Sequence, residues 1–548
     1  MASNVAEWIA NALYAYGLRN AYGIHGANSE DLFAALLRAP ADRRLAVTIA
    51  KHEFGAGAMA DGATRMTGRP ACLVATSGGA AMNCVPALAE AYQSRVPVLA
   101  LIGSPPTTGE GRGAFQDMCA GPRTVDVLTV LRGVTGFAAK VAGPDDLGPA
   151  FDGALDALER GLPAALLLPK DVQLAPCPGL PHRTAAPRAS AAPSDEVVRT
   201  VRAARRPLFL LGEAASRARL AGPVAELAAR TGAVVAVTPN GRDAAPDVGV
   251  VGVAGVMGHP SVTRAAADAD LVLALGTDLD LMDRSGLDAV IDVTCTVHVG
   301  AEPPLREVTL HESSRDLAAY TRALAAAVGG RTRAAWTAIV PEPILVPRND
   351  SGIMTCADAV DALAPAIPAD ALVFADAGNA GAAAVHRLPL GSGERFLVAL
   401  GMGGMGHGIA AGIGAAIATR RPTVILAGDG AFFMHGMEIH TAIEGRAPVV
   451  LVVLNNDAHG MCVAREDKFF PDLTSINRFR PSLIGAGLAA MFPSLRARSA
   501  TTPDGARAAF ADLLAGRGGG PSVLEIATDP AEIPPFAALL PDTAKEHR

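Results

Sequence analysis

This chain of 548 residues has few cysteines, and they follow no pattern. Its seven cysteines are scattered without a CxxC pair, whereas zinc sites and disulfide frameworks need regularly spaced thiols. The irregular spacing argues against both and predicts reduced thiols in a cytoplasmic protein. Positive charge is also scarce. The formal net charge is −7 and no basic cluster marks a surface for nucleic acid, so no nucleic-acid partner is expected.

The sequence also lacks the signals of export and membrane insertion. Residues 1–7 contain no positively charged region followed by an apolar stretch, so we expect no signal peptide. An apolar run from Gly408 to Thr419 is too short to span a bilayer. Because that run is rich in glycine and alanine, it predicts a buried helix packed closely on a neighbour. We therefore expect no membrane partner.

Hydrophobic residues, by contrast, make up half of the chain. A single hydrophobic core stops growing near ~250–300 residues, so the length predicts several domains. Two stretches rich in proline and alanine are typical of linkers. The resulting division is an N-terminal domain at 1–175, a linker at 176–193, a central domain at 194–336, a second linker at 337–352 and a C-terminal domain at 353–548.

Each of the three ranges alternates short apolar runs with helical patterns. Short, unbroken apolar runs predict strands buried on both faces, and their alternation with helices predicts parallel sheets covered by helices on both sides. We therefore predict an α/β fold with three doubly wound parallel-sheet domains. The runs that predict strands are 45–49, 73–76 and 98–102 in the first range, 207–211 and 271–275 in the second, and 372–375, 423–427 and 448–454 in the third.

Two of these runs end in polar residues suited to a metal ion. The run 423–427 leads into Gly428-Asp429-Gly430, and the run 448–454 ends at Asn455-Asn456. In a parallel sheet the carboxyl ends of both strands meet at the edge where α/β proteins bind ligands. A carboxylate, an amide oxygen and a nearby carbonyl suit an octahedral Mg²⁺ that also holds phosphate oxygens. Gly-Asp-Gly alone is also compatible with an ordinary turn, but the spacing favours the metal site.

These features resemble the motifs of enzymes that depend on thiamine diphosphate (ThDP). The Mg²⁺-diphosphate motif of that family has the form of the Gly-Asp-Gly and Asn-Asn pair, and residues 52–68 are similar almost letter for letter to the stretch HE-x-x-A-x-x-M-A-x-G-x-A-R-x-T-G. Three α/β domains in this order resemble the pyrimidine-binding, central and diphosphate-binding domains of the acetolactate synthase, pyruvate oxidase and benzaldehyde lyase group. The resemblance covers nearly the full length.

The resemblance implies which residues bind the metal and the diphosphate. It implies that Mg²⁺ is held by Asp429, Asn456 and the carbonyl of Ala458. It implies contacts with the diphosphate or its loop at Gly428, Gly430, Ala431 and Asn379. Asn379 is equally compatible with a residue that only forms a turn.

Two further segments are implied to act on the pyrimidine half of the cofactor. Glu53 is compatible with an ordinary glutamate in the first turn of a helix, but the resemblance implies that it hydrogen-bonds the aminopyrimidine ring. A carboxyl group in an apolar cleft can share a proton with a ring nitrogen, and the resulting imino tautomer can deprotonate the thiazolium carbon. In the glycine-rich segment 399–406, the resemblance implies that Met405 bends the cofactor and that the Gly403 carbonyl accepts from its amino group.

Residues outside the cofactor motifs bear on the reaction. Pyruvate decarboxylases have an acidic residue at the position of Ala27 and a His-His pair in the next active-site loop. That loop here is Gly113-Ala114-Phe115-Gln116-Asp117, and it contains no histidine. The proton relay of a simple aldehyde-releasing decarboxylase is therefore missing.

The same loops favour a carboligase or a lyase. Phe115-Gln116 resembles acetolactate synthase, and His25 with Gln116 resembles benzaldehyde lyase, in which His and Gln hydrogen-bond substrate oxygens. Asn28 belongs to the same pocket. A histidine that packs a loop and a glutamine on the surface are the alternatives. Arg465 falls where biosynthetic acetolactate synthase has a tryptophan that shapes acceptor choice, and it would either grip an acidic acceptor or lie on the surface.

These residues predict a ThDP- and Mg²⁺-dependent enzyme that forms or cleaves a carbon–carbon bond in a 2-oxo acid such as pyruvate or in a 2-hydroxyketone. The alternatives are a non-oxidative 2-oxo acid decarboxylase and a catalytically silent regulatory subunit. Segments 257–259 and 275–280 keep the outline of a flavin-bearing domain, but relatives keep that outline and lose the flavin, so we expect no FAD. The family builds each site from two subunits, which implies an obligate homodimer and often a homotetramer.

Overall fold

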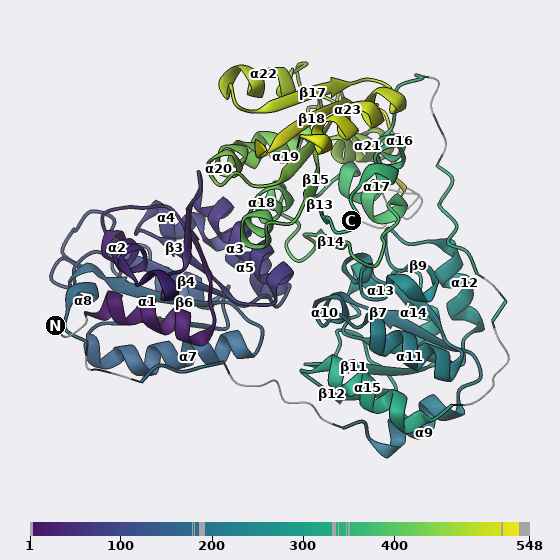
Figure 1. Ribbon diagram of the computed structural model, residues 1–548, viewed down its shortest axis with the longest axis horizontal. Helices are drawn as coiled ribbons and strands as arrows, with labels where there is room; N and C mark the ends of the chain where they lie inside the picture. The colour runs from purple at the N-terminus through teal and green to yellow at the C-terminus, as the bar shows by residue number, and fades with distance from the viewer. Residues whose placement is uncertain are drawn as a thin grey trace.

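The computed structural model contains three domains, each built on one six-stranded parallel sheet (Figure 1). The N-terminal domain, in purple and blue, lies at the left of the view, the C-terminal domain, in green and yellow, at the top, and the central domain, mostly teal, at the lower right. The predicted α/β fold with three doubly wound sheets is confirmed. The structure describes residues 4–177, 179, 181–185, 192–330, 336–337, 339–346, 348, 351–516 and 519–535.

The two predicted linkers lie partly outside the described residues. Residues 178, 180 and 186–191 of the first linker are not described, nor are 338, 347 and 349–350 of the second. Residues 331–335 of the central range and 517–518 and 536–548 of the C-terminal range also lie outside the described part. Within the described part, the strands of each sheet all fall inside one of the three predicted ranges.

The N-terminal sheet has the strand order β2-β1-β3-β4-β6-β5, and every pair is parallel. Along β3, Leu73 packs into the core that contains α3, whereas Val74 packs into the core that contains α1, so both faces are covered. The strands are β1 (Asn20–Gly23), β2 (Ala46–Ile49), β3 (Ala71–Ala75), β4 (Val98–Ser104), β5 (Phe137–Lys140) and β6 (Ala164–Pro169). The helices are α1 (Val5–Tyr16), α2 (Glu30–Arg38), α3 (Glu53–Thr67), α4 (Gly79–Asn83), α5 (Val85–Gln93), α6 (Val127–Arg132), α7 (Leu147–Glu159) and α8 (Lys170–Leu174).

The C-terminal sheet repeats the topology of the N-terminal sheet, with the parallel order β14-β13-β15-β16-β18-β17. In both sheets the order reverses between the first and third strands, which is the switch point where such sheets bind ligands. The strands are β13 (Leu372–Ala375), β14 (Arg395–Val398), β15 (Thr423–Gly428), β16 (Val449–Asn455), β17 (Arg496–Ala500) and β18 (Ser522–Ala527). The helices are α16 (Cys356–Leu363), α17 (Asn379–Arg387), α18 (His407–Thr419), α19 (Asp429–His435), α20 (Ile439–Glu444), α21 (Gly460–Phe469), α22 (Ile484–Met491) and α23 (Pro503–Ala515).

The central sheet has a different parallel order, β12-β11-β10-β7-β8-β9. Numbered from its own first strand, this is the 3-2-1-4-5-6 order of dinucleotide-binding folds, with its switch point between β7 and β10. The strands are β7 (Pro207–Leu211), β8 (Val234–Val237), β9 (Val250–Val253), β10 (Leu271–Leu275), β11 (Cys295–Gly300) and β12 (Leu310–Ser313). The helices are α9 (Asp195–Ala203), α10 (Glu213–Arg217), α11 (Ala221–Thr231), α12 (Pro260–Asp268), α13 (Leu281–Arg284), α14 (Asp288–Val293) and α15 (Leu317–Val328).

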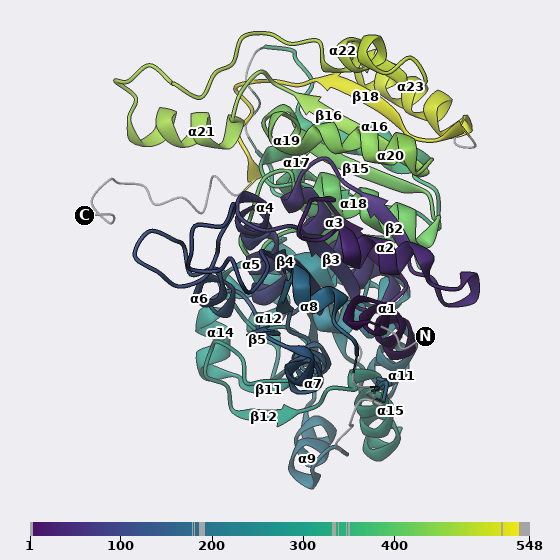
Figure 2. The ribbon, with the colours of Figure 1, turned by 90° about the vertical axis from the view of Figure 1, so that its left-hand side faces the viewer.

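Helices α3 and α18 join the two terminal domains, and they lie side by side in both ribbon views (Figures 1 and 2). Two glycines permit the close approach. A Cβ at Gly62 would lie 2.1 Å from the Ala411 carbonyl oxygen, and a Cβ at Gly414 would lie 2.3 Å from the Met59 carbonyl oxygen. The buried Tyr22 hydroxyl donates a hydrogen bond of 2.8 Å to the Gly414 carbonyl. The predicted buried, closely packed helix at 408–419 is thus confirmed as most of α18.

Among the described residues, no helix is long and apolar enough to cross a membrane. All seven cysteines are free.

Candidate active site

The carboxyl edge of the C-terminal sheet, beside its switch point, brings the predicted metal residues together. Strands β15 and β16 are parallel neighbours, as predicted, so Asp429 and Asn456 follow adjacent strand ends. Both side chains are buried, and the Ala458 amide donates hydrogen bonds of 3.1 Å to Asp429 Oδ2 and to Asn456 Oδ1. Burial raises the pKa of Asp429 to about 6. A nearby cation would reverse that shift, because it favours the ionised carboxylate.

Asn379 completes this group from the other strand of the switch point, β13. Its Oδ1 is buried and has no hydrogen-bond partner. A Cβ at Gly460 would lie 2.5 Å from Asn456 Nδ2 and 3.1 Å from Asn379 Nδ2, so the two asparagines lie against the same glycine. Buried polar atoms normally have hydrogen-bond partners. The unpaired Oδ1 of Asn379 is therefore consistent with a ligand-binding site.

The glycines beside these residues leave open space. A Cβ at Gly428 or at Gly378, whose φ is +98°, would meet no atom within 4 Å. Ala431 is buried in the first turn of α19. Within the described residues, no group of three or more His, Cys, Asp and Glu could hold a metal. The predicted ligands are one carboxylate together with an amide oxygen and a carbonyl oxygen, a donor set that suits Mg²⁺. The residues fit a Mg²⁺-diphosphate group.

The glycine-rich segment 399–406 lies next to this group. Met405 reaches the Gly-Asp-Gly turn, because its Cε is 3.1 Å from where a Cβ at Gly430 would lie. Gly403 has a φ of +65° and open space at its Cβ position. Asp376, at the end of β13, accepts from the amides of Gly406 at 2.8 Å and Ile409 at 3.2 Å. The segment is thus anchored at its end to the switch point.

Glu53 begins α3, as predicted, at the end of the helix that contacts the C-terminal domain through His52 and Phe54. Its Oε2 accepts a hydrogen bond of 2.9 Å from Asn83 Nδ2. The next residue, Phe54, stacks on His435 with a centroid distance of 4.2 Å and lies 3.8 Å from the Cβ position of Gly404. The start of α3 therefore contacts the glycine-rich segment. The contacts of the Glu53 side chain itself do not include the residues predicted to hold the metal.

A carboxylate of the C-terminal domain fixes the start of α3. The buried Glu438 accepts hydrogen bonds of 3.0 Å from the amides of Lys51 and His52. A Cβ at Gly55 would lie only 2.2 Å from Glu438 Oε1, so a larger residue there would displace the Glu438 side chain. Glu438 thus holds the backbone immediately before Glu53.

Two of the predicted substrate residues, Asn28 and Gln116, are linked at the switch point of the N-terminal sheet. The loop after β1, which contains His25, and the turn after β3 lie together, and Ser77 in that turn links two of the predicted residues. Asn28 Nδ2 donates to Ser77 Oγ at 2.7 Å, and Ser77 Oγ donates to Gln116 Oε1 at 3.0 Å. Gln116 has a φ of +60°, an uncommon backbone conformation for a residue with a side chain.

The remaining pocket predictions fall on exposed side chains. Phe115 is 86 % exposed, and His25 and Ala27 are also exposed, with the His25 ring 5.3 Å from the ring of Phe33. The exposed Arg465 lies on α21, with its guanidinium 5.4 Å from the centre of the Phe469 ring of the same helix. The described contacts of Arg465 do not join it to the other predicted site residues.

A cavity of about 950 Å³ opens at the switch point of the central sheet and reaches all three domains. Carboxylates line it where β7 and β10 end, namely at Glu213, Asp278, Asp280 and Asp283. Burial, reinforced by the charge of Asp280, raises the pKa of Asp283 to about 7. The amides of the β7 turn are used internally, since Gly212 and Ala214 donate to the carbonyls of Leu275 and Gly276.

Several residues that shape the site were not predicted from the sequence. They are Ser77, Asn83, His435 and Glu438, together with the cluster around Arg65 described below. Ser77 and Glu438 had no visible signal, because their partners lie far away in the chain.

The fold and the site define a class of protein, an α/β protein with two topologically equivalent domains, one of which carries a candidate Mg²⁺-diphosphate site. Three family descriptions match the chain. They are the N-terminal TPP binding domain, the central domain and the C-terminal TPP binding domain of thiamine pyrophosphate enzymes, at residues 3–124, 194–304 and 376–526. Together they cover more than two thirds of the sequence. The chain belongs to the thiamine pyrophosphate enzyme family.

Curated relatives carry more specific names. The chain is 27 % identical to the acetolactate synthase isozyme 2 large subunit of Escherichia coli over 98 % of both chains. It is 26 % identical to the isozyme 1 large subunit of the same organism, over 85 % of this chain and 84 % of the relative. It is also 27 % identical to a candidate 2-ketoarginine decarboxylase, AruI, of Pseudomonas aeruginosa, over 84 % of this chain and 83 % of the relative.

A solved structure has the same fold. It is the X-ray structure of a candidate thiamin diphosphate-dependent enzyme from Mycobacterium smegmatis, with a TM-score of 0.77 at 22 % identity. The match covers 96 % of this chain and all of the other.

Proposed function

We propose that this protein is a ThDP- and Mg²⁺-dependent enzyme that forms or cleaves a carbon–carbon bond next to a carbonyl group. The substrate would be a 2-oxo acid such as pyruvate or a 2-hydroxyketone. The observation that carries the proposal is the group formed by Asp429, Asn456 and the orphaned Asn379 beside open glycines. Acetolactate synthases among the relatives support the carboligase class.

In this proposal Mg²⁺ is held by Asp429, Asn456 and the Ala458 carbonyl, and the diphosphate lies against the turn at 428–431. Asn379 would offer its NH₂ group to the diphosphate, and its unpaired oxygen could accept only from a donor or a cation. The bound cofactor supplies the carbanion chemistry, whereas the protein supplies geometry and electrostatics.

Glu53 would hold the proton that passes to and from the aminopyrimidine ring. The Gly403 carbonyl would accept from the amino group of that ring, and Met405 would keep the two rings in contact. Asn83, which donates to Glu53 Oε2, leaves Oε1 available for the ring. In this proposal the Glu53 carboxylate would exchange one proton with the ring through Oε1.

The substrate-binding residues would be His25 and Gln116. Because Ser77 donates to Gln116 Oε1, the amide is turned so that its Nε2 group is the one left to donate. Gln116 would therefore recognise an oxygen that accepts, such as the carbonyl or carboxylate of a 2-oxo acid. Ala27, Asn28, Phe115 and Arg465 remain proposed members of the pocket, with Arg465 suited to an acidic acceptor.

A 2-oxo acid decarboxylase is the second candidate, and the similarity to the decarboxylase AruI favours it. The absence of a histidine from loop 113–117 speaks against release of a free aldehyde by the usual proton relay. Product analysis after incubation of the holoenzyme with pyruvate and an aldehyde separates the two. An acyloin or acetolactate supports ligation, and free aldehyde alone supports decarboxylation.

We infer that the protein does not use FAD. The central cavity lies where a dinucleotide would bind. Its lining combines the carboxylates of Glu213, Asp278, Asp280 and Asp283 with five arginines, Arg65, Arg95, Arg160, Arg217 and Arg315. The amides of the β7 turn that could hold phosphate are already bonded to carbonyls. The purified protein should lack flavin absorbance and should bind no added FAD. Stoichiometric FAD in the purified protein would contradict this inference.

We also infer an obligate homodimer that can pair further into a homotetramer, with each site shared between subunits. Exposed apolar side chains beside the site support it, since Met402, Phe433, Met434 and Met437 are all 43 % exposed or more. Exposed apolar patches of this kind often mark interfaces. Sedimentation should yield a dimer or tetramer, and an active monomer would contradict the inference.

Two substitutions test the proposed function. Glu53→Gln should reduce turnover by at least about 100-fold, because the amide cannot take up the proton, while Mg²⁺-dependent ThDP binding remains. Asp429→Ala should abolish that binding. Unchanged turnover in Glu53→Gln would overturn the mechanism. A wild-type protein that binds ThDP but turns over no 2-oxo acid or 2-hydroxyketone would instead support the silent regulatory subunit.

A further inference from the structure

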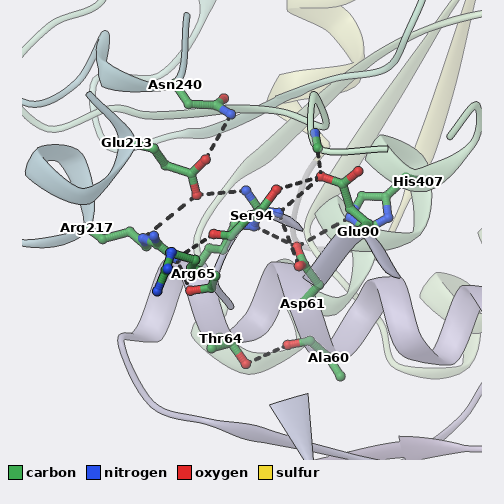
Figure 3. A network of polar contacts seen from close by, with 12 residues as sticks. Ala60, Asp61, Thr64, Arg65, Glu90, Ser94, Glu213, Arg217, Asn240 and His407 are labelled. Carbon is green, nitrogen blue, oxygen red and sulfur yellow. Dashed lines mark hydrogen bonds and ion pairs between the residues drawn. The ribbon is translucent and has the colours of Figure 1, made fainter. Parts of the chain in front are cut away.

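A buried cluster of charged side chains joins all three domains next to the glycine-rich segment (Figure 3). At its centre, Arg65 of α3 donates to Asp61 at 2.8 Å, to Glu213 of the central domain at 2.8 Å and to Glu90 of α5 at 3.4 Å. The side chains of Arg65, Asp61 and Glu90 are 2 % exposed or less. None of these residues belongs to the proposed catalytic or metal-binding set.

One member of the cluster binds the backbone of the cofactor segment directly. Glu90 Oε1 accepts from the Gly401 amide at 3.1 Å, and Glu90 Oε2 accepts from the Met402 amide at 2.5 Å. One carboxylate of the N-terminal domain thus holds two successive amides of the C-terminal domain. Gly403, whose carbonyl is proposed to meet the pyrimidine, follows immediately.

The segment has little else to hold it at this point. Met402 is 61 % exposed, so its side chain does not anchor the chain in a core. Before the segment, Asn240 of the central domain brackets Val398, with hydrogen bonds of 2.9 Å to both its amide and its carbonyl. At the last residue of the segment, Asp376 accepts a hydrogen bond from the Gly406 amide. Between Val398 and Gly406, the backbone of the segment is bound by the carboxylate of Glu90.

The cluster keeps Glu90 ionised and in place. Burial alone would raise the pKa of Glu90, but the charges of His407 and Arg65 outweigh it and lower that pKa. Ser94 Oγ also donates to Glu90 Oε1 at 2.9 Å. Burial opposes protonation of His407, yet its hydrogen bond to Asp61 raises its pKa. Carboxylates and cations in the cluster therefore compensate one another.

We propose that Glu90 is a positioning residue for the cofactor. By accepting hydrogen bonds from the amides of Gly401 and Met402, it fixes the backbone position of the segment. That position determines where Gly403 and Met405 lie relative to the pyrimidine and thiazolium rings. This inference rests on the proposed function for the identity of the cofactor. It adds that an N-terminal-domain carboxylate, outside the recognised motifs, sets the geometry of the pyrimidine half of the site without touching the diphosphate half.

The test compares Glu90→Gln with Glu213→Gln, a matched change in the same cluster. Glutamine at 90 keeps one acceptor oxygen but turns its NH₂ group toward an N–H donor, so one charge-assisted hydrogen bond is lost. Glu213 also pairs with Arg65, but its carboxylate accepts hydrogen bonds from Arg65 and Asn240 rather than from the segment. Calorimetry would measure the binding of ThDP and of inorganic diphosphate, each with Mg²⁺.

We expect Glu90→Gln to weaken ThDP binding by about tenfold or more and to leave diphosphate binding within about twofold of wild type. Glu213→Gln should leave both affinities unchanged, because the carboxylate of Glu90 still binds the segment. A purely structural role for Glu90 would weaken both ligands equally, and that result overturns the proposal. Unchanged ThDP affinity in Glu90→Gln overturns it as well. If Glu90→Gln does not fold, Glu90→Asp retains the charge but is too short to reach both amides, and the same expectations apply.

Hydrogen exchange provides a second readout that needs no cofactor. The amides of Gly401 and Met402 should exchange about tenfold faster in Glu90→Gln than in wild type or in Glu213→Gln. Equal exchange in the three proteins would refute the role proposed for Glu90. If the wild type binds neither ThDP nor diphosphate, the proposed function fails, whereas the exchange rates still decide whether Glu90 fixes this segment.

Discussion

The contact between α3 and α18 predicts that Gly62→Ala destabilises the protein, although alanine is the better helix former. Gly62 lies inside α3, facing α18. A Cβ added there would lie 2.1 Å from the Ala411 carbonyl oxygen and 2.6 Å from its carbon. Those atoms are backbone and cannot rotate away, so the two helices must separate. The contact that unites the terminal domains would loosen as a result.

The magnitude follows from two opposing terms. Replacing glycine by alanine inside a helix stabilises by up to about 1 kcal/mol. Forcing a methyl group into a packed interface costs about 1–3 kcal/mol. The second term is at its upper end here, because the neighbour is a helix backbone. We expect a net loss of about 1–2 kcal/mol, which lowers the thermal midpoint by a few degrees.

Scanning calorimetry of Gly62→Ala and a matched control tests this reasoning. The control is Gly487→Ala in α22, where a Cβ would meet no atom within 4 Å. The control should unfold at the wild-type midpoint or above it, and Gly62→Ala below it. Comparing midpoints is appropriate, because a three-domain chain need not unfold in two states. A Gly62→Ala midpoint equal to or above that of the control would refute the close-contact argument.

Three other outcomes are expected. Glu438→Gln should lower kcat roughly tenfold with little change in diphosphate affinity, because the amides of Lys51 and His52 lose the carboxylate that holds the start of α3. Unchanged steady-state kinetics would contradict this prediction. Ser77→Ala should raise KM for a 2-oxo acid more than it lowers kcat, since Gln116 loses the bond that orients its amide, and a pure kcat effect would argue against that role. The raised pKa of His407 means that its pairing with Asp61 stabilises the fold fully below pH 6.5. That contribution is lost as the pH rises through the raised pKa, so denaturant titrations should show stability falling there in wild type but not in His407→Gln.

The sequence was sufficient for the elements whose signals are local. Strands β15 and β16 are unbroken apolar runs, and consecutive parallel strands are usually neighbours, so Asp429 and Asn456 could be expected at one edge. The small residues at 408–419 predicted the buried helix α18 for a similar reason. Glycine and alanine in an apolar run indicate that another backbone must come close.

Other features depend on contacts between distant parts of the chain. Arg65 and Glu213 are 148 residues apart, and Glu90 and Met402 are 312 residues apart. No periodicity or turn signal connects such pairs. The shared topology of the first and third sheets could not be predicted from the sequence either, because the length and composition of the strands do not determine their order in the sheet.

The sequence by itself determined the three α/β domains, the edge at which Asp429 and Asn456 meet, and the place of Glu53 at a helix start. These follow from hydrophobic patterning and from the chain order of parallel strands, which are local properties. Only the tertiary structure decided which side chains support the site. Ser77 hydrogen-bonds Gln116, Glu438 binds the backbone just before Glu53, and Glu90 binds the backbone of the glycine-rich segment. Such roles require segments that are distant in the chain to approach within hydrogen-bond distance, and only the packing of loops and domains fixes that distance.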